Sequence, residues 1–213
     1  MQPQPRRTGQ APVAPSASAA LLEIRLAGRG GQGIVTAGEI LGEAVLEGGR
    51  HAQSLPTFGP ERRGALAQCT LRVSDAPIQL KCSTASPRVL VCLDPTIWRH
   101  APITLGLRED AQLIFNTIAP ADDVETALRS RSYVSSLTLE RFSVHTLDAT
   151  GIALEAIGRP ISNTAMLGAV AGVTGVVERD AIEAVLRARF GPAGDANVAA
   201  ARAGFEAVTG GTR

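Results

Sequence analysis

The stretch LAGRGGQGIVTAGEIL, residues 26–41, limits the possible folds more than any other part of the chain. An apolar run ends there in a cluster of glycines, and apolar residues recur at helical spacing directly after it. Gly28, Gly30 and Gly33 have the G-x-G-x-x-G spacing that holds dinucleotides, and two of them also fit the first half of a phosphate-binding P-loop. The segment therefore predicts a strand, a tight turn and the N-terminus of a helix, an arrangement that favours an anion.

Neither nucleotide template is complete. A P-loop needs a lysine and a hydroxyl residue after its second glycine, whereas Ile34 and Val35 follow here, which excludes NTP hydrolysis at this turn. A dinucleotide site needs a carboxylate about 20 residues further on, and residues 49–59 contain none. Two interpretations stay open: the glycines only permit tight packing, or the turn binds an anion. The candidate residues of the turn are Gly30, Gly31, Gln32 and Gly33.

The rest of the chain alternates between strand-like and helix-like segments. With 213 residues, of which 45% are hydrophobic, the chain can form one sizeable domain. Short apolar runs separated by helix-length segments predict a Rossmann-like α/β fold, with a mainly parallel sheet and helices on both faces. The predicted strands are 21–28, 51–56, 65–74, 88–94, 112–117 and 142–148.

The last third of the chain is predicted to be helical, because apolar residues recur at helical spacing over 182–190. An earlier helix contains Gly168 and Gly172, which cost helix stability unless they permit close helix packing. We divide the chain into one domain, residues 21–213, and a Pro-, Ala- and Ser-rich arm, residues 1–20. The arm is expected to be disordered or bound to a partner.

Composition argues against several functions. The net charge of +1 gives no reason to expect a nucleic-acid or membrane surface, and no apolar stretch is long enough to span a membrane. The three cysteines, Cys69, Cys82 and Cys92, form no C-x-x-C pair, so we expect no iron–sulfur cluster and no metal site in this chain. Buried thiols in a reducing cytoplasm are the expectation instead.

Two further segments contain candidate binding residues. TFGPERRGA, residues 57–65, places Arg62 and Arg63 on a glycine- and proline-bounded loop, where they could bind a phosphate or a partner's carboxylate. A solvated charged turn is the alternative. In SNTAMLGA, Asn163 either points into a ligand cleft or caps a helix together with Ser162, and the cap is the favoured interpretation.

No catalytic residue is identified. His51, His100 and His145 have no nucleophile at a recognisable spacing, and the chain contains neither G-x-S-x-G nor H-E-x-x-H. A turn shaped for phosphate without visible catalytic residues indicates a subunit of a larger assembly.

Four segments in a fixed order resemble a known family. They are GRGGQGIVTAGEIL, GPERRGALAQCTLRVSDAPI, PRVLVCLDPTI and SNTAMLGAVAGVTGVV. In this order they resemble the gamma subunit of the 2-oxoacid:acceptor oxidoreductases, the pyruvate/2-oxoacid ferredoxin oxidoreductase gamma family. The resemblance covers residues 22–208 and leaves the arm outside.

The resemblance implies a non-catalytic gamma subunit of a multi-subunit enzyme that oxidatively decarboxylates a 2-oxoacid to an acyl-CoA. Alpha-, beta- and delta-type subunits would be its partners and would hold thiamine diphosphate, magnesium and iron–sulfur clusters. The gamma chain would support assembly and flank the coenzyme A route. The glycine turn, Arg62, Arg63 and Asn163 are then candidates for contact with coenzyme A.

The substrate is not determined by the resemblance, because pyruvate, 2-oxoglutarate, branched-chain, indolepyruvate and phenylglyoxylate enzymes all resemble this chain. Its small size, arginine-rich composition and extra arm favour an aromatic-acid enzyme such as phenylglyoxylate dehydrogenase. In that type, electrons would reach NAD through an FAD-containing subunit. Two alternatives stay open: a free-standing nucleotide-binding reductase, and a scaffold whose glycine turn binds nothing.

Overall fold

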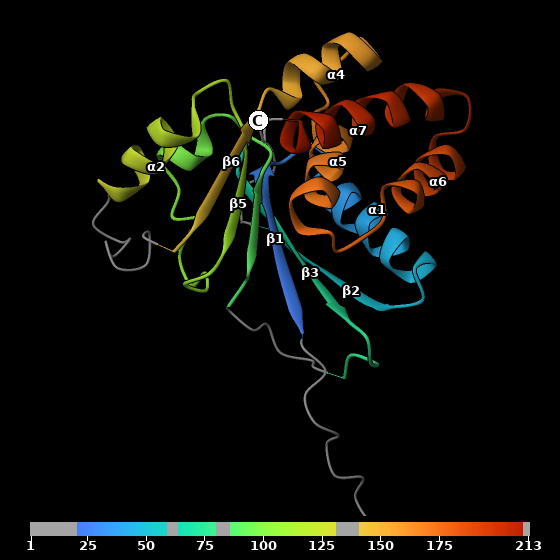
Figure 1. Ribbon diagram of the computed structural model, residues 1–213, viewed down its shortest axis with the longest axis horizontal. Coiled ribbons are helices and arrows are strands. Elements are labelled where there is room, and N and C mark those ends of the chain that lie inside the picture. Colours follow the sequence, from blue (N-terminus) through green and yellow to red (C-terminus); the bar gives the residue numbers. More distant parts are fainter. Residues whose placement is uncertain (1–20, 59–63, 80–85, 131–140, 211–213) are drawn as a thin grey trace, which may run out of the picture.

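The chain forms a six-stranded sheet with helices packed on both of its faces (Figure 1). This computed structural model describes residues 21–58, 64–79, 86–130 and 141–210. The strands are β1 (Leu22–Arg29), β2 (His51–Phe58), β3 (Leu66–Ser74), β4 (Val89–Cys92), β5 (Gln112–Asn116) and β6 (Ser143–Leu147). The helices are α1 (Ile34–Glu47), α2 (Ala121–Arg129), α4 (Ala149–Ile157), α5 (Asn163–Thr174), α6 (Arg179–Phe190) and α7 (Gly194–Thr209), with the 3-10 turns η1 (Ile97–Arg99) and η2 (Gly191–Ala193).

The strand order β2-β3-β1-β4-β5-β6 places β1 inside the sheet. The strands β1, β4, β5 and β6 pair in parallel, whereas β3 pairs antiparallel with both β1 and β2. All strands except β3 therefore run in one direction, which confirms the mainly parallel sheet expected from the sequence. Because parallel strands end at the same edge, the turn after β1 lies at the carboxyl edge with the ends of β4, β5 and β6.

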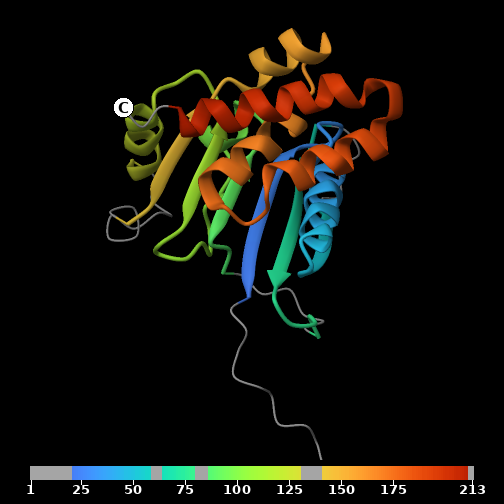
Figure 2. The same ribbon diagram turned by 45° about the vertical axis from the view of Figure 1, so that its right-hand side comes forward.

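Two apolar clusters explain why both faces of the sheet are covered. On one face α1, α5, α6 and α7 bury a cluster that includes Ile24, Leu41 and Val91. On the other face η1 and α2 cover a second cluster that contains Trp98 and Phe115, whose ring centroids lie 5.9 Å apart. Figure 2 shows α7 running across the helical layer above the sheet. The helical last third of the chain thus builds most of one layer.

The helices α5 and α7 pack with their backbones in contact. A Cβ added at Gly168 would lie 1.8 Å from the backbone oxygen of Ala201, and one at Gly204 would lie 2.0 Å from that of Ala165. Only a glycine can occupy either position at this separation. The close helix packing expected from the glycines of α5 is therefore confirmed at Gly168.

The predicted strands and the helix after the turn are all present, with ends shifted by a few residues. What periodicity did not predict is the insertion of β3 between β1 and β2. Cys69 and Cys92 are buried free thiols, as expected, whereas Cys82 and the arm lie outside the described residues. Within the part of the chain that the structure describes, no helix has the length and apolarity needed to cross a membrane.

Candidate functional site

The glycine turn, residues 30–33, connects the end of β1 to the start of α1. Gly31 and Gly33 have φ angles of 99° and 74°, in the left-handed region that other residues rarely adopt. A Cβ at Gly28 would lie 2.4 Å from the Ile34 side chain, so this glycine lets the turn pack against the helix start. Tight packing, the first of the two interpretations, therefore accounts for Gly28.

The N-terminus of α1 suits an anion. It has no side-chain cap, and its first turn contains no acidic residue. The N–H groups of a first helical turn have no partner within the helix, and the helix dipole places partial positive charge there. Together these features leave the second interpretation, an anion site, open for the same turn.

Asn163, at the start of α5, packs against this end of α1. Its Nδ2 lies 2.6 Å from the place that a Cβ of Gly33 would occupy, and the residue is buried. Its Oδ1 accepts a hydrogen bond from the backbone N–H of Thr164 at 2.9 Å. In the cap expected of Asn163 together with Ser162, the part of Ser162 is wrong, because the Ser162 side chain makes no capping bond and its hydroxyl instead faces the carbonyl of Leu93.

Gln32 braces the turn against the neighbouring strand. Its Oε1 accepts a hydrogen bond from the N–H of Arg29 at 2.7 Å, and its Nε2 donates to Oδ2 of Asp94 at 2.8 Å. Asp94 follows β4, the parallel neighbour of β1, and is only 4% exposed. Its Oδ1 accepts from the backbone N–H groups of Thr96 and Ile97. Gln32 therefore stabilises the turn.

The Asp94 carboxylate is ionised at neutral pH. Burial by itself would raise the pKa of Asp94, but hydrogen bonds from Thr96, Gln32 and Ile97 outweigh burial and hold this pKa below its ordinary value. The Arg29 guanidinium balances the negative charge, with Nε 3.2 Å from Oδ2. The carboxylate can therefore accept hydrogen bonds through both oxygens.

The arginine loop, residues 57–65, ends beside the glycine turn. The N–H of Gly30 donates to the carbonyl oxygen of Ala65 at 3.0 Å, and Nη1 of Arg29 donates to that of Gly64 at 2.9 Å. The antiparallel pairing of β1 with β3 produces this contact. Two motifs that are separate in the sequence thus meet at the carboxyl edge.

Arg62 and Arg63 themselves lie outside the described residues, so their contact with a ligand stays a prediction. Asp94 is the residue that the sequence analysis missed. A signal was present, because the apolar run of β4 leads directly to this acidic residue at the end of a parallel strand, where ligands of such sheets bind.

An open cleft of about 390 Å³ adjoins the turn at the ends of β4, β5 and β6. Thr96 belongs to its lining and also contacts the Asp94 carboxylate and Nη2 of Arg29, so the turn and the cleft share a wall. Arg99, also in the lining, places its guanidinium over the Trp98 ring, 4.9 Å from the centroid. The carboxyl edge therefore places an open cleft beside the glycine turn.

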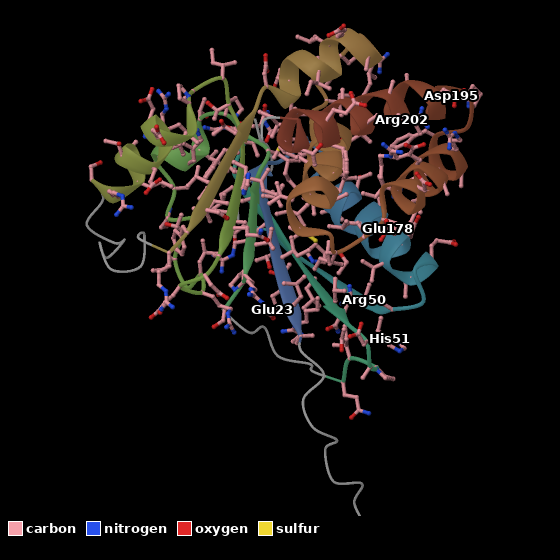
Figure 3. The ribbon with its side chains drawn as sticks, in the orientation of Figure 1. Glu23, Arg50, His51, Glu178, Asp195 and Arg202 are labelled. Atoms are coloured by element: carbon pink, nitrogen blue, oxygen red, sulfur yellow. The ribbon has the colours of Figure 1, made fainter. Side chains whose placement is uncertain are left out.

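Two of the three histidines, His51 and His145, lie on the outer strands β2 and β6. His51 begins β2 and lies, with Glu23, toward the opposite edge of the sheet from the turn (Figure 3). His145 lies on β6, where burial lowers its pKa. Among the described residues, no three His, Cys, Asp or Glu side chains are grouped to hold a metal ion. The expected absence of a metal and of a catalytic residue in this chain stays a prediction.

The sheet topology argues against a dinucleotide site. In the dinucleotide fold, the ribose carboxylate comes from the strand next to β1. Here the antiparallel β3 occupies that place, and β2 lies at the edge of the sheet. The glycines thus have the spacing of a dinucleotide site, but the strand that would supply the ribose carboxylate is not beside β1.

Comparison with known proteins shows where this arrangement recurs. Residues 23–207 match the family described as pyruvate ferredoxin/flavodoxin oxidoreductase. The chain belongs to this family. A curated member, pyruvate synthase subunit PorC of Methanothermobacter marburgensis, is 42% identical over 187 residues, which are 87% of this chain and 97% of the relative.

A second family member has a broader name. The pyruvate/ketoisovalerate oxidoreductases common subunit gamma of Pyrococcus abyssi is 42% identical and is matched over 96% of its length by 87% of this chain. Among solved structures, the pyruvate oxidoreductase subunit PORC of Thermotoga maritima superposes with a TM-score of 0.74 at 36% identity, covering 87% of this chain and 96% of that one. The resemblance to a gamma chain of this family is therefore confirmed in sequence and in fold.

Proposed function

We propose that the chain is the gamma subunit of a multi-subunit enzyme that oxidatively decarboxylates a 2-oxoacid to an acyl-CoA. The observation that carries this proposal is the match with gamma-type chains over nearly their whole length. In this role the chain supports assembly and one substrate site, and other subunits supply the catalytic groups. A free-standing nucleotide-binding reductase is disfavoured, because β3 separates β1 from β2.

We propose further that coenzyme A is the ligand of the carboxyl edge. Coenzyme A carries a pyrophosphate and a 3′-phosphate, and three features of this edge suit phosphate. The α1 N-terminus is uncapped, the arginine loop ends beside the turn, and the Asp94 charge is balanced by Arg29. The proposed contacts are the backbone around Gly30, Gly31, Gln32 and Gly33, with Arg62, Arg63 and Asn163 around it.

The arginine loop provides the test. Arg62→Ala and Arg63→Ala are introduced into the assembled complex, and KM for coenzyme A is measured beside reduction of the iron–sulfur clusters without coenzyme A. Charge-assisted hydrogen bonds contribute roughly 1.5–3 kcal/mol each, so KM should rise about 10- to 100-fold in at least one variant. Cluster reduction should be unchanged, because decarboxylation takes place on other subunits.

Arg141→Ala is the matched control, since Arg141 is an exposed arginine paired with Glu109 and distant in the fold from the glycine turn. It should leave KM for coenzyme A unchanged. A normal KM in both loop variants would rule out a loop contact with coenzyme A. Failed cluster reduction in a complex that still assembles would contradict the proposed division of labour between subunits.

The proposed partners are alpha-, beta- and delta-type subunits, which would hold thiamine diphosphate, a magnesium ion and iron–sulfur clusters. The family description names ferredoxin and flavodoxin, and we propose one of these as electron acceptor; a route through FAD to NAD finds no support in the relatives' names. We propose the cytoplasm as the compartment, since a reducing environment keeps buried thiols such as Cys69 and Cys92 unpaired.

For the substrate, the names of the relatives point to pyruvate and ketoisovalerate. We propose that the enzyme uses one of these 2-oxoacids. Phenylglyoxylate, favoured by composition and by the arm, finds no support in those names and is the second substrate to test. Activity of the purified native complex on each 2-oxoacid in turn decides between them.

A further inference from the structure

Asp94 divides its two carboxylate oxygens between two tasks. Oδ1 accepts from the backbone N–H groups of Thr96 and Ile97, at 2.8 and 3.0 Å, and from the hydroxyl of Thr96. These bonds, all from the segment that directly follows Asp94, orient the carboxylate. Oδ2 then faces the neighbouring strand, where Nε2 of Gln32 donates at 2.8 Å and Nε of Arg29 lies at 3.2 Å.

Gln32 transmits this orientation to the glycine turn. Its Oε1 accepts from the N–H of Arg29 at 2.7 Å, while its own backbone N–H donates to the Arg29 carbonyl at 3.1 Å. The side-chain amide is thus held at both ends, by Arg29 before the turn and by Asp94 across from it. Since Gly31 and Gly33 on either side have left-handed backbone and glycine has more conformational freedom than any other residue, this brace selects one of the conformations open to the turn.

We propose that Asp94 is a positioning residue: through Gln32 it holds the glycine turn in the conformation that receives a phosphate of coenzyme A. This inference rests on the proposed function for its ligand, but not for its geometry. The carboxylate does not contact the ligand in this proposal. It acts by fixing which way the backbone N–H groups of the turn point.

The direction of the hydrogen bond between the two side chains can be reversed. Asp94→Asn puts an amide where the Oδ2 acceptor was, so two N–H donors face each other. Gln32→Glu alone places two carboxylate oxygens together, which repel. In the double variant Asp94→Asn, Gln32→Glu, the new amide donates to the new carboxylate, whose second oxygen still accepts from Arg29. Oδ1 of the asparagine keeps its backbone donors, and the net charge is unchanged.

Two measurements on the full chain and the assembled complex follow from this. Amide hydrogen exchange of the peptide over residues 27–36 should be about 10-fold faster in each single variant and within about 3-fold of the unaltered chain in the double variant. KM for coenzyme A should rise in Asp94→Asn, with kcat changed less than 3-fold. The Gln32 variants are compared by exchange alone, because Gln32 belongs to the turn proposed to bind coenzyme A. Asp110→Asn is the matched control, because it removes an exposed carboxylate that also binds arginines, and neither quantity should change.

The exchange data decide the role of Asp94. Unchanged exchange in both single variants overturns the positioning role, and so does a double variant that exchanges at least as fast as the faster single variant. Restored exchange supports it. KM decides the ligand separately: if exchange responds and is restored while KM stays normal in Asp94→Asn, Asp94 holds the turn but the turn does not serve coenzyme A, and the proposed function of the turn falls.

Discussion

Gly33 and Asn163 come from different thirds of the chain and touch at the site. Gly33 has a left-handed backbone, and Nδ2 of the buried Asn163 lies 2.6 Å from the place that its Cβ would occupy. Gly31 also has a left-handed backbone, but no atom of the described residues lies within 4 Å of the place that its Cβ would occupy. At the scale of single residues, an added methyl group would therefore meet only backbone strain at Gly31, but both backbone strain and a steric collision at Gly33.

We expect unequal effects from the two alanine substitutions. Gly31→Ala should lower the free energy of unfolding by about 1 kcal/mol, from backbone strain alone. Gly33→Ala should lower it by about 2–3 kcal/mol, because its methyl group also collides with the Asn163 amide. Urea denaturation of the full chain measures both values. Equal losses would show that the Asn163 contact does not restrict this position.

Helix pairs in this chain are joined by two different kinds of contact. The α5–α7 pair relies on small residues, because Gly168 and Gly204 bring the two backbones together. The α6–α7 pair adds an ion pair to apolar packing: the buried Glu183 accepts hydrogen bonds from both Nε and Nη2 of Arg202. Figure 3 shows Arg202 where α6 and α7 run side by side. At the scale of elements, the layer over the sheet combines close apolar packing with an oriented ion pair.

The backbone contact between α5 and α7 predicts that alanine lowers the stability of the protein at a glycine of α5 and raises it at a glycine of α1. Gly168→Ala should lower the free energy of unfolding by about 3 kcal/mol, because the methyl group meets a backbone oxygen that cannot rotate away. Gly42→Ala in α1 meets only ordinary contacts, at 3.4 Å or more, and should raise it by about 0.5–1 kcal/mol. Thermal or urea unfolding compares the two. A tolerated Gly168→Ala would contradict the observed α5–α7 separation.

Ionisable groups in separate parts of the fold respond to acid together. The pKa of Asp94 is lowered, as described above, and hydrogen bonds from Arg202 hold the pKa of Glu183 below its ordinary value, despite burial. Burial also lowers the pKa of His145 on β6. In each case the unfolded chain binds a proton at a higher pH than the folded chain, so acid favours unfolding.

At the scale of the whole molecule, we therefore expect stability to fall in two stages as the pH drops from neutral. The first begins below about pH 6.5, where unfolded His145 takes up a proton that the folded chain resists. The second begins below about pH 4, where Asp94 and Glu183 protonate first in the unfolded chain. Urea denaturation at a series of pH values measures both. His145→Gln should remove the first stage only, and a flat profile between pH 7 and 5 would contradict this assignment.

The sequence by itself determined the order of strands and helices, the turn between β1 and α1, and the glycine-dependent packing of α5. These features depend on spacing between near neighbours in the chain, on apolar periods and on the limited set of residues that a left-handed turn accepts. The family was also readable from the order of four segments, because the match extends over residues 23–207.

Only the tertiary structure decided how these pieces meet. Periodicity cannot report which strands pair, so the insertion of β3 beside β1, and with it the contact between the arginine loop and the glycine turn, was not predictable. The brace from Asp94 to Gln32 joins the ends of two parallel strands, and the residue facing Gly168 comes from α7. Each of these contacts joins residues far apart in the chain, and it exists only once the sheet and its helical layer have packed.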